Sequence, residues 1–152
     1  MGAVSRVVVV PPGEGEVVPR RFGERTVVKA AEPETRGAYA VRENTAPAGF
    51  GGVPFHRHLG AEEAFYVLAG ELTVFTQDRT LAVPTGAFML VPRGTVHSLA
   101  NRGAVPVRWL TLISPAWVSG RIQEEAADLD EQQRAAVYLR YGLEIVGPPP
   151  AP

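Results

Sequence analysis

Cysteine is absent from the 152 residues, and histidine occurs only three times, at His56, His58 and His97. Without cysteine the chain cannot form a disulfide framework, a cysteine-ligated zinc or iron–sulfur site, or a cysteine nucleophile. Neither sign of charge is in excess, because 15 basic and 16 acidic side chains give a net charge of −1. This balance gives no reason to expect nucleic acid or an anionic membrane as a partner.

Long apolar runs are missing as well. The β-branched run near the start, Val7–Val10, has four residues, which is too few for a secretory signal. No stretch of the sequence has the length of a membrane span. We therefore expect a cytoplasmic protein whose partner is a small molecule, with no membrane and no nucleic acid involved.

Turn-forming residues are abundant. The chain has 16 glycines and 14 prolines beside a hydrophobic fraction of 45%, a combination typical of short strands joined by turns. Segments rich in Val, Thr and aromatic residues predict strands at 6–10, 26–31, 38–45, 64–68, 72–76, 80–83, 88–91, 95–100 and 107–113. Turn signals recur about every eight to twelve residues, which predicts an all-β sandwich or barrel.

The composition changes after Pro115. Residues 118–142 are rich in Glu, Gln, Ala, Asp and Leu and contain no proline, which predicts helix. Asp130 and Gln133 have the spacing of a capping box, and Gly142 is suited to ending a helix. Helical spacing predicts that this segment packs on the barrel through Ala135, Tyr138 and Leu139.

We expect a single domain, because 152 residues leave no room for a second full core. Its parts are an N-terminal strand and loop (1–25), the barrel (26–115), a helical segment packed on the barrel (116–147) and a flexible tail (148–152).

Two of the histidines, His56 and His58, are separated by one residue. On a strand, side chains at positions i and i+2 point to the same face, so both imidazoles face one side and Arg57 faces the other. Two imidazole nitrogens on one face can bind the same metal ion at about 2.0–2.1 Å. The alternation therefore predicts a metal site on this strand.

The following strand offers a carboxylate. Glu63 shares its parity with Phe65 and Val67, so it lies on an otherwise apolar inward face. A carboxylate there is costly unless a cation pairs with it, and a divalent metal ion does so. Glu62 is the alternative ligand, which parity disfavours, and an ion pair with a nearby arginine is the structural alternative for Glu63.

The third histidine, His97, follows the turn Pro92-Arg93-Gly94. Three imidazoles and one carboxylate suit Fe, Mn, Ni, Co, Cu or Zn, whereas Ca²⁺ and Mg²⁺ prefer oxygen ligands. Four protein ligands still leave an open position on an octahedral ion, which a catalytic site needs and a structural site lacks.

These residues resemble the cupin family. The segment up to Gly70 is similar to the first cupin motif, which reads His-x-His, four residues, Glu, six residues, Gly, and which is here His56, His58, Glu63 and Gly70. One glycine departs from the pattern, because Gly51 leaves four residues before His56 where the family usually has five. That glycine marks a turn and binds no metal.

The second cupin motif is matched in full. It consists of a glycine, five residues, Pro-x-Gly, two residues, a histidine, three residues and an asparagine, which are here Gly86, Pro92, Gly94, His97 and Asn101. We expect Asn101 to anchor the backbone of a turn and not to bind metal.

The resemblance covers residues 26–149 and implies an all-β cupin barrel, also described as a double-stranded β-helix or jelly roll, with one or two C-terminal α-helices. The small single-domain bacterial cupins that resemble quercetin 2,3-dioxygenase are the most similar group. This implies that His56, His58, Glu63 and His97 hold one divalent transition metal per chain, either Fe, Mn, Ni or Zn. It also implies that Glu63 acts as the catalytic general base.

The reaction that we expect first is metal-dependent dioxygenation of a small hydroxylated or enolic compound, with O₂ as the second substrate. A non-redox isomerase, epimerase or polyketide cyclase with zinc as Lewis acid is the alternative. A non-catalytic cupin that binds a small molecule is the third hypothesis. The resemblance further implies a homodimer, in which residues 6–10 are a candidate exchange or edge strand.

Inward-facing apolar side chains are expected to line the substrate pocket, and the candidates are Phe65, Val67, Tyr39, Met89 and Trp109. Tyr66 and Tyr138 are further candidates for substrate contact. The basic pair Arg20-Arg21 is expected to be solvated.

Overall fold

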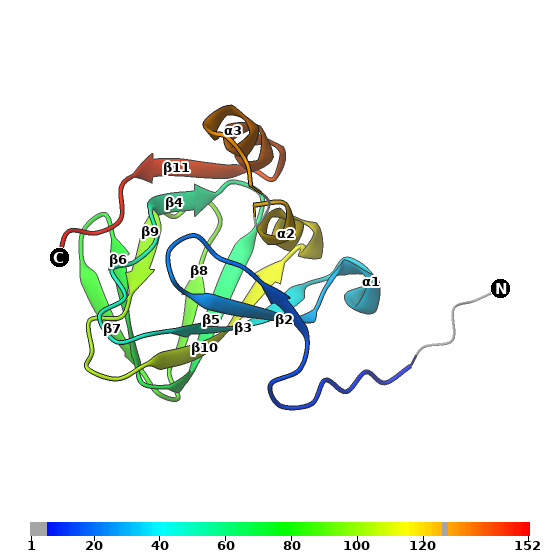
Figure 1. Cartoon of the computed structure of the whole chain (residues 1–152), viewed down its shortest axis with the longest axis horizontal. Helices are drawn as coiled ribbons and strands as arrows, with labels where there is room; N and C mark the ends of the chain where they lie inside the picture. The colour runs from blue at the N-terminus through cyan, green and yellow to red at the C-terminus, as the bar shows by residue number, and fades with distance from the viewer. Residues whose placement is uncertain (1–5, 126–127) are drawn as a thin grey trace.

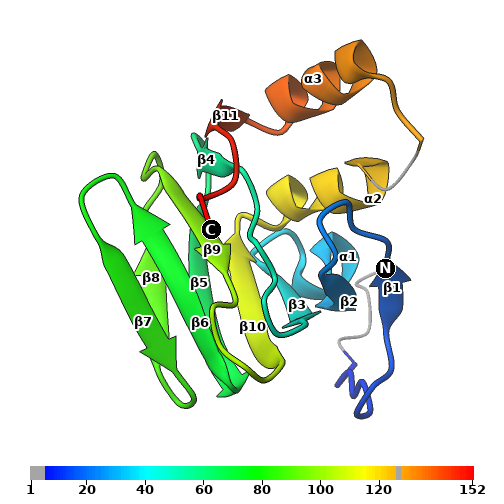
Figure 2. The same cartoon turned by 60° about the vertical axis from the view of Figure 1, so that its left-hand side comes forward.

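The computed structural model describes residues 6–125 and 128–152, and this part of the chain folds into two antiparallel sheets that face each other (Figures 1 and 2). The six-stranded sheet has the order β1 (Glu16–Val18), β2 (Arg25–Ala30), β3 (Ala40–Ala46), β10 (Val107–Ser114), β5 (Glu62–Ala69) and β8 (Phe88–Val91). The five-stranded sheet has the order β11 (Leu143–Gly147), β4 (Phe55–His58), β9 (His97–Ala100), β6 (Glu71–Thr76) and β7 (Thr80–Pro84). The predicted all-β barrel is confirmed.

The core lies between the two sheets and follows from strand alternation. In β10 the four inward side chains are 3% exposed or less, and these are Val107, Trp109, Thr111 and Ile113. In β5 the inward face carries Glu63, Phe65 and Val67, all buried, as parity predicts. The inward faces of β5 and β10 are therefore apolar apart from Glu63 and Thr111.

Helices are short and lie mainly at one end of the barrel (Figure 2). They are α1 (Glu32–Thr35), the 3₁₀ turn η1 (Ala116–Gly120), α2 (Arg121–Glu125) and α3 (Glu131–Arg140). The predicted capping box of α3 is confirmed, because the Gln133 backbone N–H donates to Asp130 Oδ1 at 2.8 Å and the Asp130 N–H donates to Gln133 Oε1 at 2.9 Å. No helix among the described residues is long and apolar enough to cross a membrane.

The strand predicted at residues 6–10 is not formed, and this part of the prediction is wrong. Val7 is 93% exposed, and the edge of the sheet beside β2 is occupied by β1 instead. A β-branched run favours a strand only where a neighbouring strand and a packed face receive it, and no strand in the described part of the chain pairs with the run. Pairing of this segment with a second copy stays a prediction.

The C-terminal segment also differs from the prediction, because the helix ends at Arg140 and residues 143–147 form β11, paired with β4. Gly142 has φ +68°, which ends the helix and redirects the chain into the sheet. The expected packing face of α3 is wrong as well, because Leu139 is 83% exposed and Val137 is the buried residue. The helix touches the barrel along a narrower stripe than the helical spacing suggested.

The tail after β11, predicted to be flexible, contacts the barrel at two points. The Phe55 backbone N–H donates to the Pro148 carbonyl at 3.4 Å, and Arg102 donates to the Ala151 carbonyl. Asn101 anchors the turn before β10, as expected, because its Nδ2 donates to the Pro47 and Val105 carbonyls at 3.0 and 2.8 Å.

The turn between β5 and β6 depends on Gly70, whose φ is +74° and whose added Cβ would lie 2.5 Å from the Pro106 carbonyl oxygen. We expect Gly70→Ala to lower the free energy of unfolding by about 2–4 kcal/mol, because left-handed strain and the close approach add. Gly86→Ala is the matched control, since its φ is +85° and nothing lies within 4 Å of the added Cβ. It should cost about 1–2 kcal/mol. If urea unfolding showed the same loss of free energy for both variants, the close contact with the Pro106 carbonyl would add no cost of its own.

Candidate metal centre

Four side chains from both sheets meet inside the barrel. His56 and His58 come from β4 and His97 from β9, all in the five-stranded sheet, whereas Glu63 comes from β5 in the opposite sheet. One ligand atom from each of the four lies within 4.8 Å of the others. The structure thus brings together the residues that the sequence singled out.

Backbone pairing sets this arrangement. His56 lies directly opposite His97 in the antiparallel β4–β9 pair, and the centroids of their rings are 4.4 Å apart. The turn before His97 is tied to the same strand, because the Gly94 backbone N–H donates to the His58 carbonyl at 2.7 Å. Gly94 has φ +79°, a conformation that suits glycine.

Two of the imidazoles are oriented by backbone carbonyls. His56 Nδ1 lies 2.8 Å from the Pro54 carbonyl oxygen, and His97 Nδ1 lies 2.9 Å from that of Thr95. A carbonyl oxygen only accepts hydrogen bonds, so Nδ1 carries the proton in each ring. Nε2 of each ring is then left as the metal-binding nitrogen, the arrangement common for histidine ligands.

Glu63 is surrounded by cationic and imidazole groups. Its Oε1 lies 3.0 Å from His58 Nε2 and 3.5 Å from Arg42 Nη2, and its Oε2 lies 3.6 Å from His97 Nε2. Burial by itself raises the pKa of a carboxyl group, but His58 and His97 hold the pKa of Glu63 well below its usual value. Glu63 is therefore a buried carboxylate at neutral pH.

The histidines differ in their electrostatics. Burial, together with the neighbouring His97 and His58, lowers the pKa of His56 well below 6.5. Burial also acts to lower the pKa of His97, but the nearby carboxylate of Glu63 outweighs it and raises that pKa. His56 is thus neutral at pH 7, which is the form that binds metal.

Unpaired buried nitrogens provide a test of whether a metal fits. Among the described residues, His58 Nδ1, His58 Nε2 and His97 Nε2 have no hydrogen-bond partner, although His58 Nε2 lies close to Glu63. Unpaired buried polar atoms are rare and costly. Ligands bound to one ion at about 2.0–2.2 Å are at most about 4.4 Å apart. The four ligand atoms, which lie within 4.8 Å of one another, would need to move only slightly closer together to bind one ion. The residues fit a divalent transition metal.

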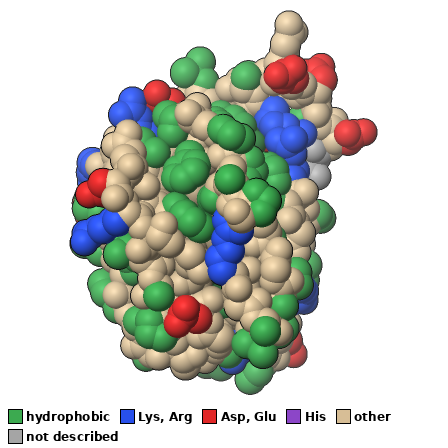
Figure 3. All heavy atoms as spheres, turned by 90° about the vertical axis from the view of Figure 1, so that its left-hand side faces the viewer, with side chains coloured by type: hydrophobic (Ala, Val, Ile, Leu, Met, Phe, Trp, Pro, Cys, Tyr) green, Lys and Arg blue, Asp and Glu red, His purple; other side chains and the backbone are tan. Residues whose placement is uncertain are grey.

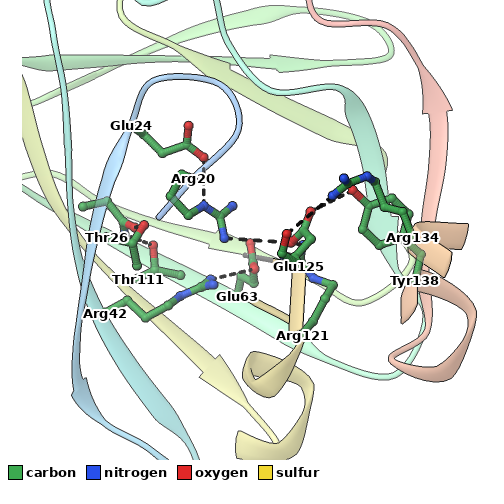
Figure 4. A network of polar contacts seen from close by, with 11 residues as sticks. Arg20, Glu24, Thr26, Arg42, Glu63, Thr111, Arg121, Glu125, Arg134 and Tyr138 are labelled. Atoms are coloured by element: carbon green, nitrogen blue, oxygen red, sulfur yellow. Dashed lines mark hydrogen bonds and ion pairs between the residues drawn. The ribbon is translucent and has the colours of Figure 1, made fainter. Parts of the chain in front are cut away.

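A cavity of about 80 Å³ adjoins the cluster, and His56 and Glu63 form part of its wall. Its other polar lining residues are Arg20, Glu24, Arg42, Asn44, Thr111, Arg121, Glu125 and Tyr138. Figure 4 shows these groups converging from several strands and from α2 and α3. The metal cluster itself is internal, and the face of the described chain in Figure 3 shows no histidine side chain.

The residues predicted for the substrate pocket are placed differently. Trp109 and Tyr138 line the cavity. Three of the others fill the core between the sheets, namely Phe65, Val67 and Met89. The remaining two tyrosines are exposed, Tyr39 by 42% and Tyr66 by 44%. Inward apolar residues at this depth pack against one another, and the cavity wall near the cluster combines polar residues with apolar ones such as Phe22, Leu99 and Trp109.

The charged residues of this wall other than Glu63 were not predicted as site residues. Arg20, which we expected to be solvated, lies in it, and its Nε donates to Glu24 Oε1 at 3.0 Å. Strand parity did hold a signal for Arg42 and Asn44, since both share the inward face of β3 with Ala40 and Ala46. Polar residues at inward positions mark a site. Arg121 and Glu125 carried no such signal, because their segment reads as an ordinary polar helix.

The fold and motifs agree with a known family. Residues 43–113 match the model of the cupin domain. This segment is a cupin domain, and the described chain has the cupin fold. The quercetin 2,3-dioxygenase of Bacillus subtilis (strain 168) is 34% identical over 71 residues, which are 47% of this chain and 21% of that protein. This cupin therefore spans about a fifth of the length of that relative.

Solved structures share the fold at low sequence identity. A Thermotoga maritima protein described as a predicted oxalate decarboxylase is 21% identical with a TM-score of 0.62, over 70% of this chain and 97% of that one. The polyketide cyclase RemF of Streptomyces resistomycificus is also 21% identical with a TM-score of 0.63, over 71% and 79% of the two chains. These likenesses establish the fold alone.

Substitution at Glu63 separates it from its neighbour as a ligand. Glu62 points away from the cluster and pairs with Arg93 Nη2 at 3.3 Å. We expect Glu63→Gln and His97→Ala to lower metal occupancy about ten-fold or more, because each removes a ligand, while Glu62→Gln leaves it unchanged. Elemental analysis of folded protein, checked by circular dichroism, measures this. Equal metal content in Glu63→Gln and the wild type would contradict the assignment.

Metal affinity should decrease as the pH is lowered, because protons compete for the imidazole nitrogens. The raised pKa of His97 means that this competition begins above pH 6.5. We expect zinc affinity to decrease about ten-fold or more between about pH 8 and about pH 6, measured by calorimetry. The same affinity at both values would show that imidazoles do not bind the ion.

Proposed function

We propose that this cupin is a metal-dependent enzyme that oxygenates a small hydroxylated or enolic compound. One observation carries the proposal: a buried three-histidine, one-carboxylate cluster forms the wall of a cavity through His56 and Glu63. A metal site that adjoins a cavity can meet a substrate, whereas a structural site is closed off by its ligands. The similarity to quercetin 2,3-dioxygenase supports the reaction class, while the small cavity points to a substrate much smaller than a flavonol.

The chain's own residues would orient and deprotonate the substrate. A bound divalent metal would act as a Lewis acid that makes a substrate hydroxyl more acidic. Glu63 then serves as the base that takes up the hydroxyl proton, and its low pKa suffices because the proton it receives is already acidic. Trp109 and Leu99 line the cavity and limit the access of water.

A second candidate is a non-redox isomerase or cyclase, and the polar cavity wall favours it. The Tyr138 hydroxyl donates to Glu125 Oε1 at 2.7 Å within this wall. Such a pair can take a proton from one position of a substrate and return it at another, which isomerisation requires and oxygenation does not. The metal would then serve only to polarise a carbonyl group.

Metal analysis together with oxygen uptake tests the proposal. Protein purified without chelator should contain about one iron, manganese or nickel ion per chain and should consume O₂ with a member of a panel of small enols. His97→Ala should lose both properties. Metal-loaded protein that exchanges substrate protons for deuterium without oxygen uptake would overturn oxygenation and favour the second candidate. Binding of a small enol without any turnover would instead indicate a non-catalytic cupin that binds a small molecule.

A further inference from the structure

Three buried arginines surround the cavity. Arg42 is on β3, Arg121 begins α2, and Arg20 lies in the loop between β1 and β2. Their side chains are 8%, 9% and 15% exposed. Figure 4 shows them approaching the same space from different sides. Buried arginines are rare unless they are paired with an acidic group.

Two of the arginines have carboxylate partners within the protein. Arg20 contacts Glu24 at 3.0 Å and Glu125 at 3.9 Å, and Arg121 contacts Glu125 through Nη1. Among residues 6–125 and 128–152, the carboxylate in contact with Arg42 is Glu63 alone, at 3.5 Å. Because Glu63 is also the carboxylate of the metal cluster, its oxygens are needed there when a metal is bound. Arg42 is then the arginine with the least internal compensation.

Hydrogen-bond donors on the cavity wall are also unused. Among the described residues, Arg42 Nε, Arg121 Nε and Trp109 Nε1 are donors that are buried without a hydrogen-bond partner, and Glu24 Oε2 is one such acceptor. All four side chains line the cavity, and the three residues that carry the donors are 7% exposed or less. A group of buried N–H donors around one space calls for an acceptor with several lone pairs.

The charges around the cavity point to an anion. Three arginines and three glutamates line it, so their charges cancel. A dication held by the cluster would leave two positive charges in excess in a buried space. Buried charge of one sign is costly unless it is compensated. A singly charged anionic substrate would offset one of these two charges.

We infer that the substrate is a small carboxylic acid whose carboxylate binds Arg42, while its hydroxyl or carbonyl oxygen faces the histidine cluster. The inference rests on the proposed function for the position of the metal. Arg42 presents a planar fork suited to a carboxylate, and Trp109 Nε1 offers a further donor. Asn44, which shares the inward face of β3 with Arg42, is fixed by two side-chain hydrogen bonds. They join it to Thr26 at 2.9 Å and to Thr111 at 2.8 Å.

Two probes of nearly equal shape test the inference. Pyruvate and 2,3-butanedione differ in that a carboxylate of the first is an acetyl group in the second. We expect zinc-loaded protein to bind pyruvate about ten-fold or more tighter in calorimetry, because charge-assisted hydrogen bonds form only with the anion. Arg42→Met should abolish this preference while zinc remains bound, and Arg42→Lys should lose part of it. Arg108→Met is the control, since Arg108 is exposed on β10 and pairs with Glu43, and it should behave like the wild type.

The outcomes separate the inference from the proposed function. Equal binding of the two probes by the wild type would overturn the inference and needs no variant. An unchanged preference in Arg42→Met, with only zinc affinity altered, would also overturn it, because Arg42 would then merely balance the charge of Glu63. If zinc does not bind but pyruvate is still preferred through Arg42, the anion site stands and the metal-dependent function fails.

Discussion

The buried negative charge of Glu63 is the constraint on which the rest of the structure depends. Placing a carboxylate inside an apolar barrel costs several kcal/mol unless opposite charges and hydrogen-bond donors surround it. Here two imidazole nitrogens and one guanidinium lie within 3.6 Å of its oxygens. These partners come from β4, β9 and β3, so the compensation of one charge joins strands of both sheets.

Compensation of this kind requires that the histidines be held in place from outside the cluster. Backbone carbonyls fix the rings of His56 and His97 through Nδ1, and the contact between Gly94 and the His58 carbonyl fixes the strand ends. None of these contacts uses the nitrogens that face Glu63. The barrel therefore supplies orientation through its backbone and leaves the side-chain nitrogens for chemistry, which is how metal ligands are usually supported.

Strand parity made the cluster and most of the barrel predictable from sequence. His56, His58 and Glu63 lie close together in the sequence, and the two-residue period of a strand suffices to place them on inward faces. The failures have a different origin. Whether residues 6–10 find a partner strand, whether the chain after Gly142 re-enters a sheet, and whether Arg121 turns inward all depend on contacts between distant segments. Local propensity does not contain that information.

Arg42 illustrates how strand parity in the sequence and contacts in the folded structure complement each other. Its inward parity on β3 was available from the sequence, but its significance appears only when Glu63 is found 3.5 Å away. Burial lowers the pKa of Arg42 to about 10, against the opposing effect of Glu63, so the guanidinium stays charged at neutral pH. It remains a cation that shares its counterion, Glu63, with the histidine cluster. Apolar pocket walls, which we expected from the inward aromatic residues, would select by shape alone. The cavity wall instead combines charged side chains such as Arg42 and Arg121 with apolar ones such as Trp109 and Leu99.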